Sequence, residues 1–170
     1  MNTLFQKYKN LCVDGSLIFL ADGDLSEPYF CYPTNAKIVG FEGCILYCFI
    51  DGYDEMVFAS NPESCAYKNV YPLAKSFSDF MRLILACGSA NPIEQIVWMD
   101  KKQYEQHIQE ELTIQTEKQK AVLLTLSREL NLSPMENPFE YVKAIQKEFD
   151  DSHIKFSDEY YGVLGIKKSC

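Results

Sequence analysis

The chain has few of the residues and patterns on which catalysis usually depends. It contains only two histidines, His107 and His153. His107 lies among polar and acidic residues, and His153 follows the run Asp150-Asp151-Ser152. We expect both to be solvated surface side chains, because nothing near them in the sequence forms a catalytic motif. The sequence therefore gives little support to general acid–base catalysis by histidine.

The sequence also lacks a targeting segment and a long apolar run. The first ten residues contain no basic stretch followed by an apolar one, as a secretory signal would require. The longest apolar-rich run, residues 44–50, is far shorter than the roughly 20 residues of a membrane helix. We therefore expect a cytoplasmic protein that does not insert into a membrane.

An excess of basic residues is missing as well. The chain carries 16 Lys and Arg against 24 Asp and Glu, a formal net charge of −8. Residues 1–90 have 6 basic and 10 acidic residues, and residues 91–170 have 10 and 14, so neither half is basic. A sequence-independent interaction with nucleic acid or anionic lipid needs a basic face. These two partner classes are excluded on that ground.

The seven cysteines show no disulfide or metal-site spacing. In a reducing compartment such cysteines behave mainly as small buried hydrophobic residues, and Cys170 is expected to be an exposed thiol. Cys44 and Cys48 lie four residues apart in an expected strand, which separates their α-carbons by roughly 13 Å. Two ligands of one zinc ion must lie much closer, so no metal site is expected there.

Several ligand-binding motifs are absent. Neither the G-x-S-x-G nucleophile turn nor a glycine-rich phosphate loop occurs. Asp22-x-Asp24 resembles the start of a calcium loop, but Glu27 and Pro33 occupy the positions that need glycine and glutamate. We expect no metal, no cofactor and no enzymatic activity.

What the chain does have is enough apolar sequence for a globular core. Hydrophobic residues make up 47% of 170 residues, a length that buries roughly 70% of its extended surface. Residues 16–21 read as a strand, residues 25–36 as a loop or edge segment, and residues 37–50 as strand broken by glycines. Residues 44–50 and 55–60 predict a β-hairpin, and the first of these strands is apolar on both faces, which indicates a strand covered on both sides.

The second half has helical periodicity and repeated start signals. Ser76-x-x-Asp79 and Asp100-x-x-Gln103 are capping-box patterns, and Asn-Pro pairs start at residues 91 and 137. Residues 121–130 and a short segment after Ser157 are also expected to be helical, whereas residues 113–120 fit either a solvated helix or a break. Strands followed by helices indicate an α+β fold, a twisted and mostly antiparallel sheet with helices packed on it. We divide the chain into residues 1–90, sheet plus core helix, and residues 91–170, a helical C-terminal extension packed on the same domain.

Acidic residues crowd the turn of the expected hairpin. The simpler interpretation is a turn whose acids keep it solvated; the alternative is an acidic and aromatic contact patch for a basic protein partner. The candidate partner-binding residues are Asp51, Tyr53, Asp54 and Glu55, joined by Asp22, Asp24 and Glu63.

Residues 43–88 contain a recognisable series of motifs: the apolar strand, the turn Asp51-Gly52-Tyr53-Asp54, the returning strand, the run Val70-Tyr71-Pro72-Leu73-Ala74 and the helix entry Ser76-Phe77-Ser78-Asp79-Phe80. This series resembles the core of the SUKH superfamily. The resemblance implies an α+β fold without shared catalytic residues, in which Leu46, Phe49, Phe58, Phe77, Phe80 and Leu83 are packing residues. It also implies a bacterial immunity protein that binds and neutralises a cognate toxin, often a nuclease.

Three functions stay open on the sequence. The first is such a toxin-neutralising binding protein, a monomer or weak homodimer with an acidic surface. The second is a regulatory or scaffold module of the same fold that docks through residues 91–132. The third is a small enzyme that uses carboxylates or a cysteine.

Overall fold

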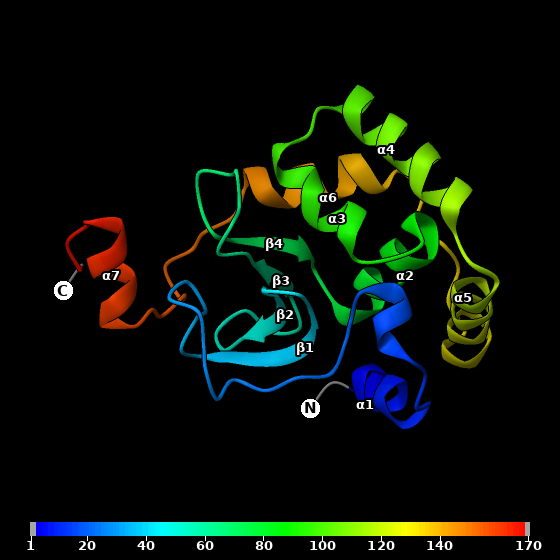
Figure 1. Ribbon diagram of the computed structural model, residues 1–170, viewed down its shortest axis with the longest axis horizontal. Helices are drawn as coiled ribbons and strands as arrows, with labels where there is room; N and C mark the ends of the chain where they lie inside the picture. Colours follow the sequence, from blue (N-terminus) through cyan, green and yellow to red (C-terminus); the bar gives the residue numbers. More distant parts are fainter. Residues whose placement is uncertain (1–2, 169–170) are drawn as a thin grey trace.

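The computed structural model describes residues 3–168, so the expectation for Cys170 lies outside the described residues. Its centre is one four-stranded sheet in the order β1-β2-β3-β4, with every neighbouring pair antiparallel. The strands are β1 (Ala36–Glu42), β2 (Ile45–Ile50), β3 (Val57–Ser60) and β4 (Val70–Ala74). The sheet and the helices around it confirm the α+β fold and the β2–β3 hairpin (Figure 1).

Helices precede and follow the sheet. They are α1 (Thr3–Asn10), η1 (Gly15–Ile18), α2 (Phe77–Cys87), α3 (Asn91–Gln95), η2 (Ile96–Trp98), α4 (Lys101–Ile114), α5 (Glu117–Leu130), α6 (Pro138–Lys147) and α7 (Asp158–Leu164). Within residues 3–168, no helix combines the length and the apolar character needed to cross a bilayer.

Two of the predicted helix starts are capped by the expected side chains, whereas α6 and α7 begin after Asn137 and Ser157 without a side-chain cap hydrogen bond among the described residues. Ser76 Oγ accepts a hydrogen bond from the backbone N–H of Asp79 at 3.1 Å and begins α2, which ends at Gly88 with φ +88°. Asp100 and Gln103 form a reciprocal capping box at the start of α4. The open question at residues 113–120 resolves as a break, because the backbone leaves the helical conformation between α4 and α5.

Strand β2 is covered on both faces, as its apolar pattern predicts. Tyr47 belongs to a first core cluster, which the strands share with α2 to α6. Leu46, Cys48 and Ile50 point to the other face and belong to a second core cluster with Cys31, Tyr32, Phe58 and Val70. Of the six packing positions implied by the SUKH resemblance, five are fully buried and Phe49 is half-buried.

One prediction for the first 21 residues needs correction. Residues 16–21 do not form a strand: residues 15–18 form η1, and only Ala21 makes an isolated bridge, to Phe41. The Asp14 side chain accepts a hydrogen bond from the Ser16 N–H, and Phe19 adopts a left-handed conformation. These local features favour a 3-10 turn over an extended strand. Helix α1 was not predicted at all.

The second core cluster is closed by a segment from the far end of the chain. We call residues 149–156 the C-terminal strap; they connect α6 with α7 and run beside the sheet (Figure 1). The Thr34 N–H donates to the Lys155 carbonyl at 2.7 Å, and the Lys155 N–H donates to Asn35 Oδ1 at 3.1 Å. Phe149, Ile154 and Phe156 of the strap pack on the second core cluster. The strap therefore covers one face of the sheet together with Leu25, Phe30, Cys31 and Tyr32.

Candidate functional site

The seven predicted partner-binding residues lie at two opposite ends of the sheet. Asp51, Tyr53, Asp54 and Glu55 form the β2–β3 turn, beside the start of β1, because Ala36 pairs with Ile50. The bridge between Ala21 and Phe41 places Asp22 and Asp24 at the other end of β1. Glu63 lies at that end too, since it follows β3 where Ser60 pairs with Leu46. The structure thus brings together the first four residues, which we call the acidic tip.

The acidic tip is a well-defined turn. The Tyr53 N–H donates to the Ile50 carbonyl and the Met56 N–H to the Tyr53 carbonyl, at 3.2 and 3.1 Å. The Asp51 carboxylate pairs with Lys37 at 2.6 Å, but both side chains are more than half exposed, so this pair contributes little to stability. Asp54 and Glu55 are exposed and form no ion pair within residues 3–168. These two carboxylates are the available charges of the tip.

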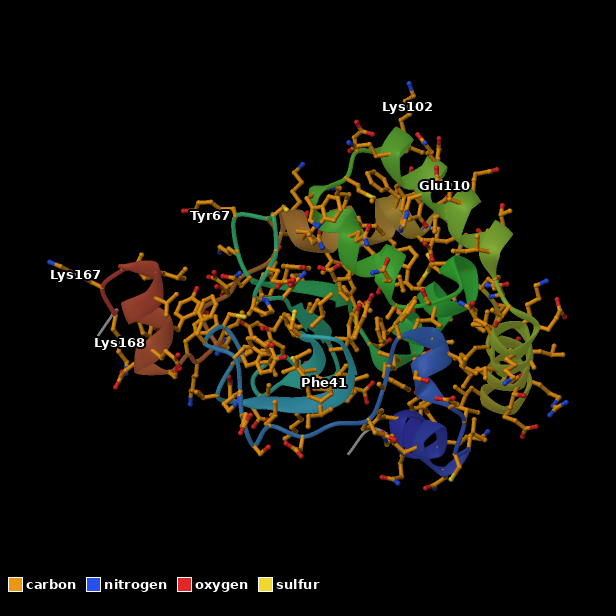
Figure 2. All side chains as sticks on the ribbon, viewed as in Figure 1. Phe41, Tyr67, Lys102, Glu110, Lys167 and Lys168 are labelled. Carbon is orange, nitrogen blue, oxygen red and sulfur yellow. The ribbon has the colours of Figure 1, made fainter. Side chains whose placement is uncertain are left out.

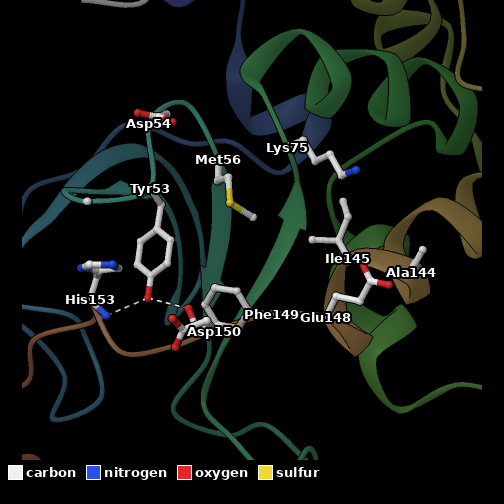
Figure 3. A pocket seen from close by; sticks show the side chains of 11 residues that line it. Tyr53, Asp54, Met56, Lys75, Ala144, Ile145, Glu148, Phe149, Asp150 and His153 are labelled. Carbon is white, nitrogen blue, oxygen red and sulfur yellow. Dashed lines mark hydrogen bonds between the residues drawn. The ribbon is translucent and has the colours of Figure 1, made fainter.

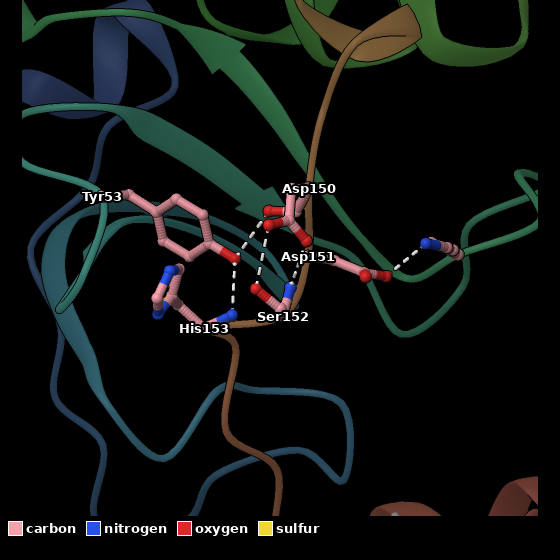
Figure 4. A network of polar contacts seen from close by, with 6 residues as sticks. Tyr53, Asp150, Asp151, Ser152 and His153 are labelled. Carbon is pink, nitrogen blue, oxygen red and sulfur yellow. Dashed lines mark hydrogen bonds and ion pairs between the residues drawn. The ribbon is translucent and has the colours of Figure 1, made fainter.

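Tyr53 points inward instead of offering its ring to a partner. It is half-buried, and its ring centroid lies 5.1 Å from that of Phe58 and 5.5 Å from that of Phe149. Its hydroxyl donates to the Asp150 carbonyl at 2.8 Å and accepts from the His153 N–H at 3.0 Å (Figure 4). Burial raises the pKa of this hydroxyl, which keeps it a donor at neutral pH. Tyr53 therefore joins the tip to the strap.

Two hollows flank the acidic tip, and Asp54 lines both. The strap hollow, about 560 Å³, lies between the tip and α6; Figure 3 shows Met56, Lys75 and Ile145 around it. The edge hollow, about 520 Å³, lies between the tip, β1 and α1. Both are of the size of sites that accommodate a few side chains or a small ligand.

The edge hollow combines apolar walls with an acidic rim. Phe5 from α1, Ile38 from β1 and Phe49 from β2 supply the apolar walls, and the rings of Phe5 and Phe49 meet edge to face at 5.2 Å. Three carboxylates of the tip, those of Asp51, Asp54 and Glu55, line the same hollow. In protein interfaces, apolar anchors surrounded by polar groups carry most of the binding free energy.

The opposite end of the sheet has a smaller, shallower hollow of about 370 Å³. Its acids are largely engaged: Asp22 pairs with Lys9 at 2.7 Å, and Asp24 accepts hydrogen bonds from the Ser26 hydroxyl and N–H, which lower the pKa of Asp24. Tyr29 lines this hollow and is about half exposed. Glu27, which also lines this hollow, and Glu63 are exposed and outside any ion pair of the described residues, so free carboxylates occur at both ends of the sheet. The acidic tip differs in that its carboxylates line a larger hollow with aromatic walls.

A pair of carboxylates that the sequence analysis missed lies between the sheet and α3. Glu94 is only 2% exposed and accepts hydrogen bonds from Tyr71 Oη and, at 2.9 Å, from Asn61 Nδ2. Glu42 accepts from Tyr47 Oη at 2.8 Å and from Asn91 at 2.6 Å. Burial raises the pKa of Glu42, and the nearby Glu94 carboxylate adds to this effect. No sequence pattern indicates this pair, because strand pairing and helix packing create it.

Three of the thiols, Cys31, Cys48 and Cys87, are buried in the core as predicted, whereas Cys12 and Cys65 are exposed. Burial raises the pKa of the Cys31 and Cys87 thiols, the latter to about 11, which suppresses the reactive thiolate.

His153 is exposed in the strap, as predicted. The prediction for His107 is wrong: it is half-buried on α4, and its Nε2 is buried without a hydrogen-bond partner among residues 3–168. His107 follows the buried Tyr104 by three residues, so the helical repeat turns both toward the core.

Within residues 3–168, no group of three or more His, Cys, Asp and Glu side chains is arranged to hold a metal ion. Comparison with known proteins yields no match to a family model, a curated protein or a solved structure. The resemblance to the SUKH superfamily therefore stays a prediction, and function has to be inferred from the acidic tip and its two hollows.

Proposed function

We propose that this chain is a non-enzymatic binding protein of the SUKH immunity type, which neutralises a basic protein toxin such as a nuclease. One observation carries the proposal: Asp54 and Glu55 are exposed and outside any ion pair of the described residues, at a tip flanked by two hollows. The net charge of −8 points in the same direction.

The physical argument has two parts. Unpaired surface carboxylates raise the rate of encounter with a basic partner and disfavour acidic ones, with little effect on the fold. Hollows with apolar walls then give the partner's side chains a place to be desolvated, which provides affinity. The acidic tip offers both features within one turn of the chain.

The partner to test is the protein encoded next to this chain in its genome, because the genes of immunity proteins of this type lie beside the genes of their toxins. We expect that protein to contain a basic toxin domain and to form a complex with this chain. The double variant Asp54→Lys/Glu55→Lys should reduce the association rate at least tenfold at low salt and abolish protection of growing cells from the toxin.

The control is Glu105→Lys/Glu110→Lys, which changes the net charge equally on α4; Glu110 lies on the outer side of this helix (Figure 2). Its association rate should stay within about threefold of the unmodified chain. Equal loss in both variants would show that only net charge matters and would remove the tip from the proposal. A chain that neither binds nor protects against the encoded toxin would overturn the function itself.

A second candidate function, a regulatory or scaffold module, is favoured by apolar side chains exposed on the helices. Ile114 at the end of α4 and Leu124 on α5 are 72% and 67% exposed. We expect Ile114→Ser/Leu124→Ser to abolish capture of a regulatory partner while leaving the folding midpoint unchanged. If this variant retains its partner and the tip variant loses it, the immunity proposal is favoured.

A further inference from the structure

We infer that the edge hollow binds a segment of the partner in which one or two apolar side chains are flanked by Lys or Arg. This inference rests on the proposed function and deepens it, because it assigns the chemistry of the partner segment and its place on the chain. It is argued from the walls of the hollow, from its rim and from its size.

The walls select an apolar side chain. Phe5 of α1 and Phe49 of β2 both pack on the first core cluster and meet in this hollow. Ile38 of β1 also lines it but packs on the second core cluster, so the two aromatic rings form the main wall. Phe49 is also in edge-to-face contact with Phe77 of α2 at 6.1 Å, so it is held in place by the first core cluster. An aromatic surface held by the core loses little conformational entropy when a ligand side chain packs on it. The walls are thus preorganised for an apolar or aromatic anchor.

The rim selects positive charge on both sides of that anchor. The carboxylates of Asp51, Asp54 and Glu55 line the hollow together with a single cation, Lys37. Lys37 is already paired with Asp51, which leaves Asp54 and Glu55 without a cation among the described residues. A basic side chain next to the anchor can pair with these carboxylates, whereas an acidic one would be repelled. Charge complementarity therefore points to a basic segment as the occupant.

The size of the hollow limits the anchor. A volume of about 520 Å³ accommodates the anchor side chain and its immediate neighbours, but not a folded domain. The strap hollow on the other side of Asp54 also has three carboxylates, those of Asp54, Glu148 and Asp150, but both Lys75 and His153 lie among them. The edge hollow has three carboxylates and only Lys37 beside them, and Lys37 is already paired with Asp51.

Three six-residue peptides with blocked ends test the inference on the full chain: KKFLKK, KKSSKK and EEFLEE. We expect KKFLKK to shift the amide resonances of residues 37–38, 49–51 and 54–55 in a saturable way. The peptides KKSSKK and EEFLEE should bind at least fivefold more weakly, because one lacks the anchor and the other the charge. Glu55→Lys should lower the affinity of the chain for KKFLKK at least threefold, and the control Glu110→Lys should leave this affinity unchanged.

Equal binding of KKFLKK and KKSSKK would overturn the inference, as would shifts centred on the hollow lined by Asp24 and Tyr29. A second copy of the chain as the occupant would also overturn it; sedimentation would then show a dimer that Glu55→Lys dissociates. No toxin enters this assay, so its failure is distinguishable from failure of the proposed function. A chain that neutralises the encoded toxin but does not discriminate among the peptides keeps the function and loses the edge hollow.

Discussion

The carboxylate of Glu94 is buried and that of Glu42 is half-buried. Both accept hydrogen bonds from amide and phenol groups, and none of the hydrogen-bond partners that the structure describes is a cation. Burial of Glu42 leaves negative charge in a poorly solvated place and raises the pKa of this carboxyl, which favours the protonated acid. It is a source of pH-dependent stability that an acidic surface residue would not provide.

The first prediction concerns this pH dependence. Burial raises the pKa of Glu42 above its value in the unfolded chain, so the folded state binds the proton more tightly. Its contribution to stability is therefore present at acidic pH and is lost as the pH rises through the folded-state pKa. We expect Glu42→Gln to remove part of this loss, so that urea midpoints at pH 5 and pH 8 differ less in the variant. An unchanged difference would contradict the assignment.

The second prediction concerns the hydroxyl that joins the tip to the strap. Tyr53→Phe leaves the His153 N–H and the Asp150 carbonyl without their shared partner, and we expect a loss of about 1–2 kcal/mol in the free energy of unfolding. The control is Tyr67→Phe, because Tyr67 is 99% exposed and projects from the loop between β3 and β4 (Figure 2). Urea denaturation of both variants measures the difference, and equal stability would show that water replaces the hydroxyl.

At the scale of elements, α2 connects the sheet with the helices that follow it. Phe80 is fully buried and lies 5.9 Å from the ring of Tyr47 on β2. We expect Phe80→Ala to destabilise the fold by about 3–5 kcal/mol, since it leaves a large cavity in the first core cluster. Leu124→Ala on α5 is the matched control: Leu124 is mostly exposed, so its loss should cost under about 1 kcal/mol. Thermal unfolding would separate the two.

Elements with explicit start or stop signals could be predicted, and those without them could not. Helices α2 and α4 begin at the caps Ser76 and Asp100, and α2 ends at the glycine after Cys87. Because these signals are local, the sequence alone is enough to predict where the two helices begin. The apolar run at residues 16–21 carries no such signal, and a local hydrogen bond to Asp14 decides its conformation. Helix α1 did carry a signal, the spacing of Leu4 and Tyr8, but it is only eight residues long.

At the scale of the whole molecule, sequence reasoning found the charges but not their arrangement. It grouped seven residues that the register of β1 separates into two ends of the sheet. The apolar walls of the edge hollow come from α1, β1 and β2, and no local pattern links residues so far apart in the chain. A site built by tertiary packing is visible only once the strands are paired.

The strap provides the last prediction. Truncation after Phe149 removes Ile154, Phe156 and Tyr160 from the second core cluster, along with the hydrogen bonds to residues 34 and 35. Losing three half-buried side chains at about 1 kcal/mol each should lower the melting temperature by roughly 6–12 °C. Truncation after Phe156, which removes α7 but keeps the whole strap, should lower it less, because α7 has no buried residue. Equal melting temperatures of the two truncated chains would contradict this role.

The strap also sets the order in which the molecule can be completed during translation. Residues 34 and 35 leave the ribosome long before their partners at 153 and 155. Until then only the segment with Leu25, Phe30, Cys31 and Tyr32 can cover this face of the sheet, so the side of Phe58 that contacts Phe149 stays exposed to chaperones. Slow synthesis of the final third of the chain would prolong that exposure, so codon usage over residues 110–150 should influence the yield of native protein.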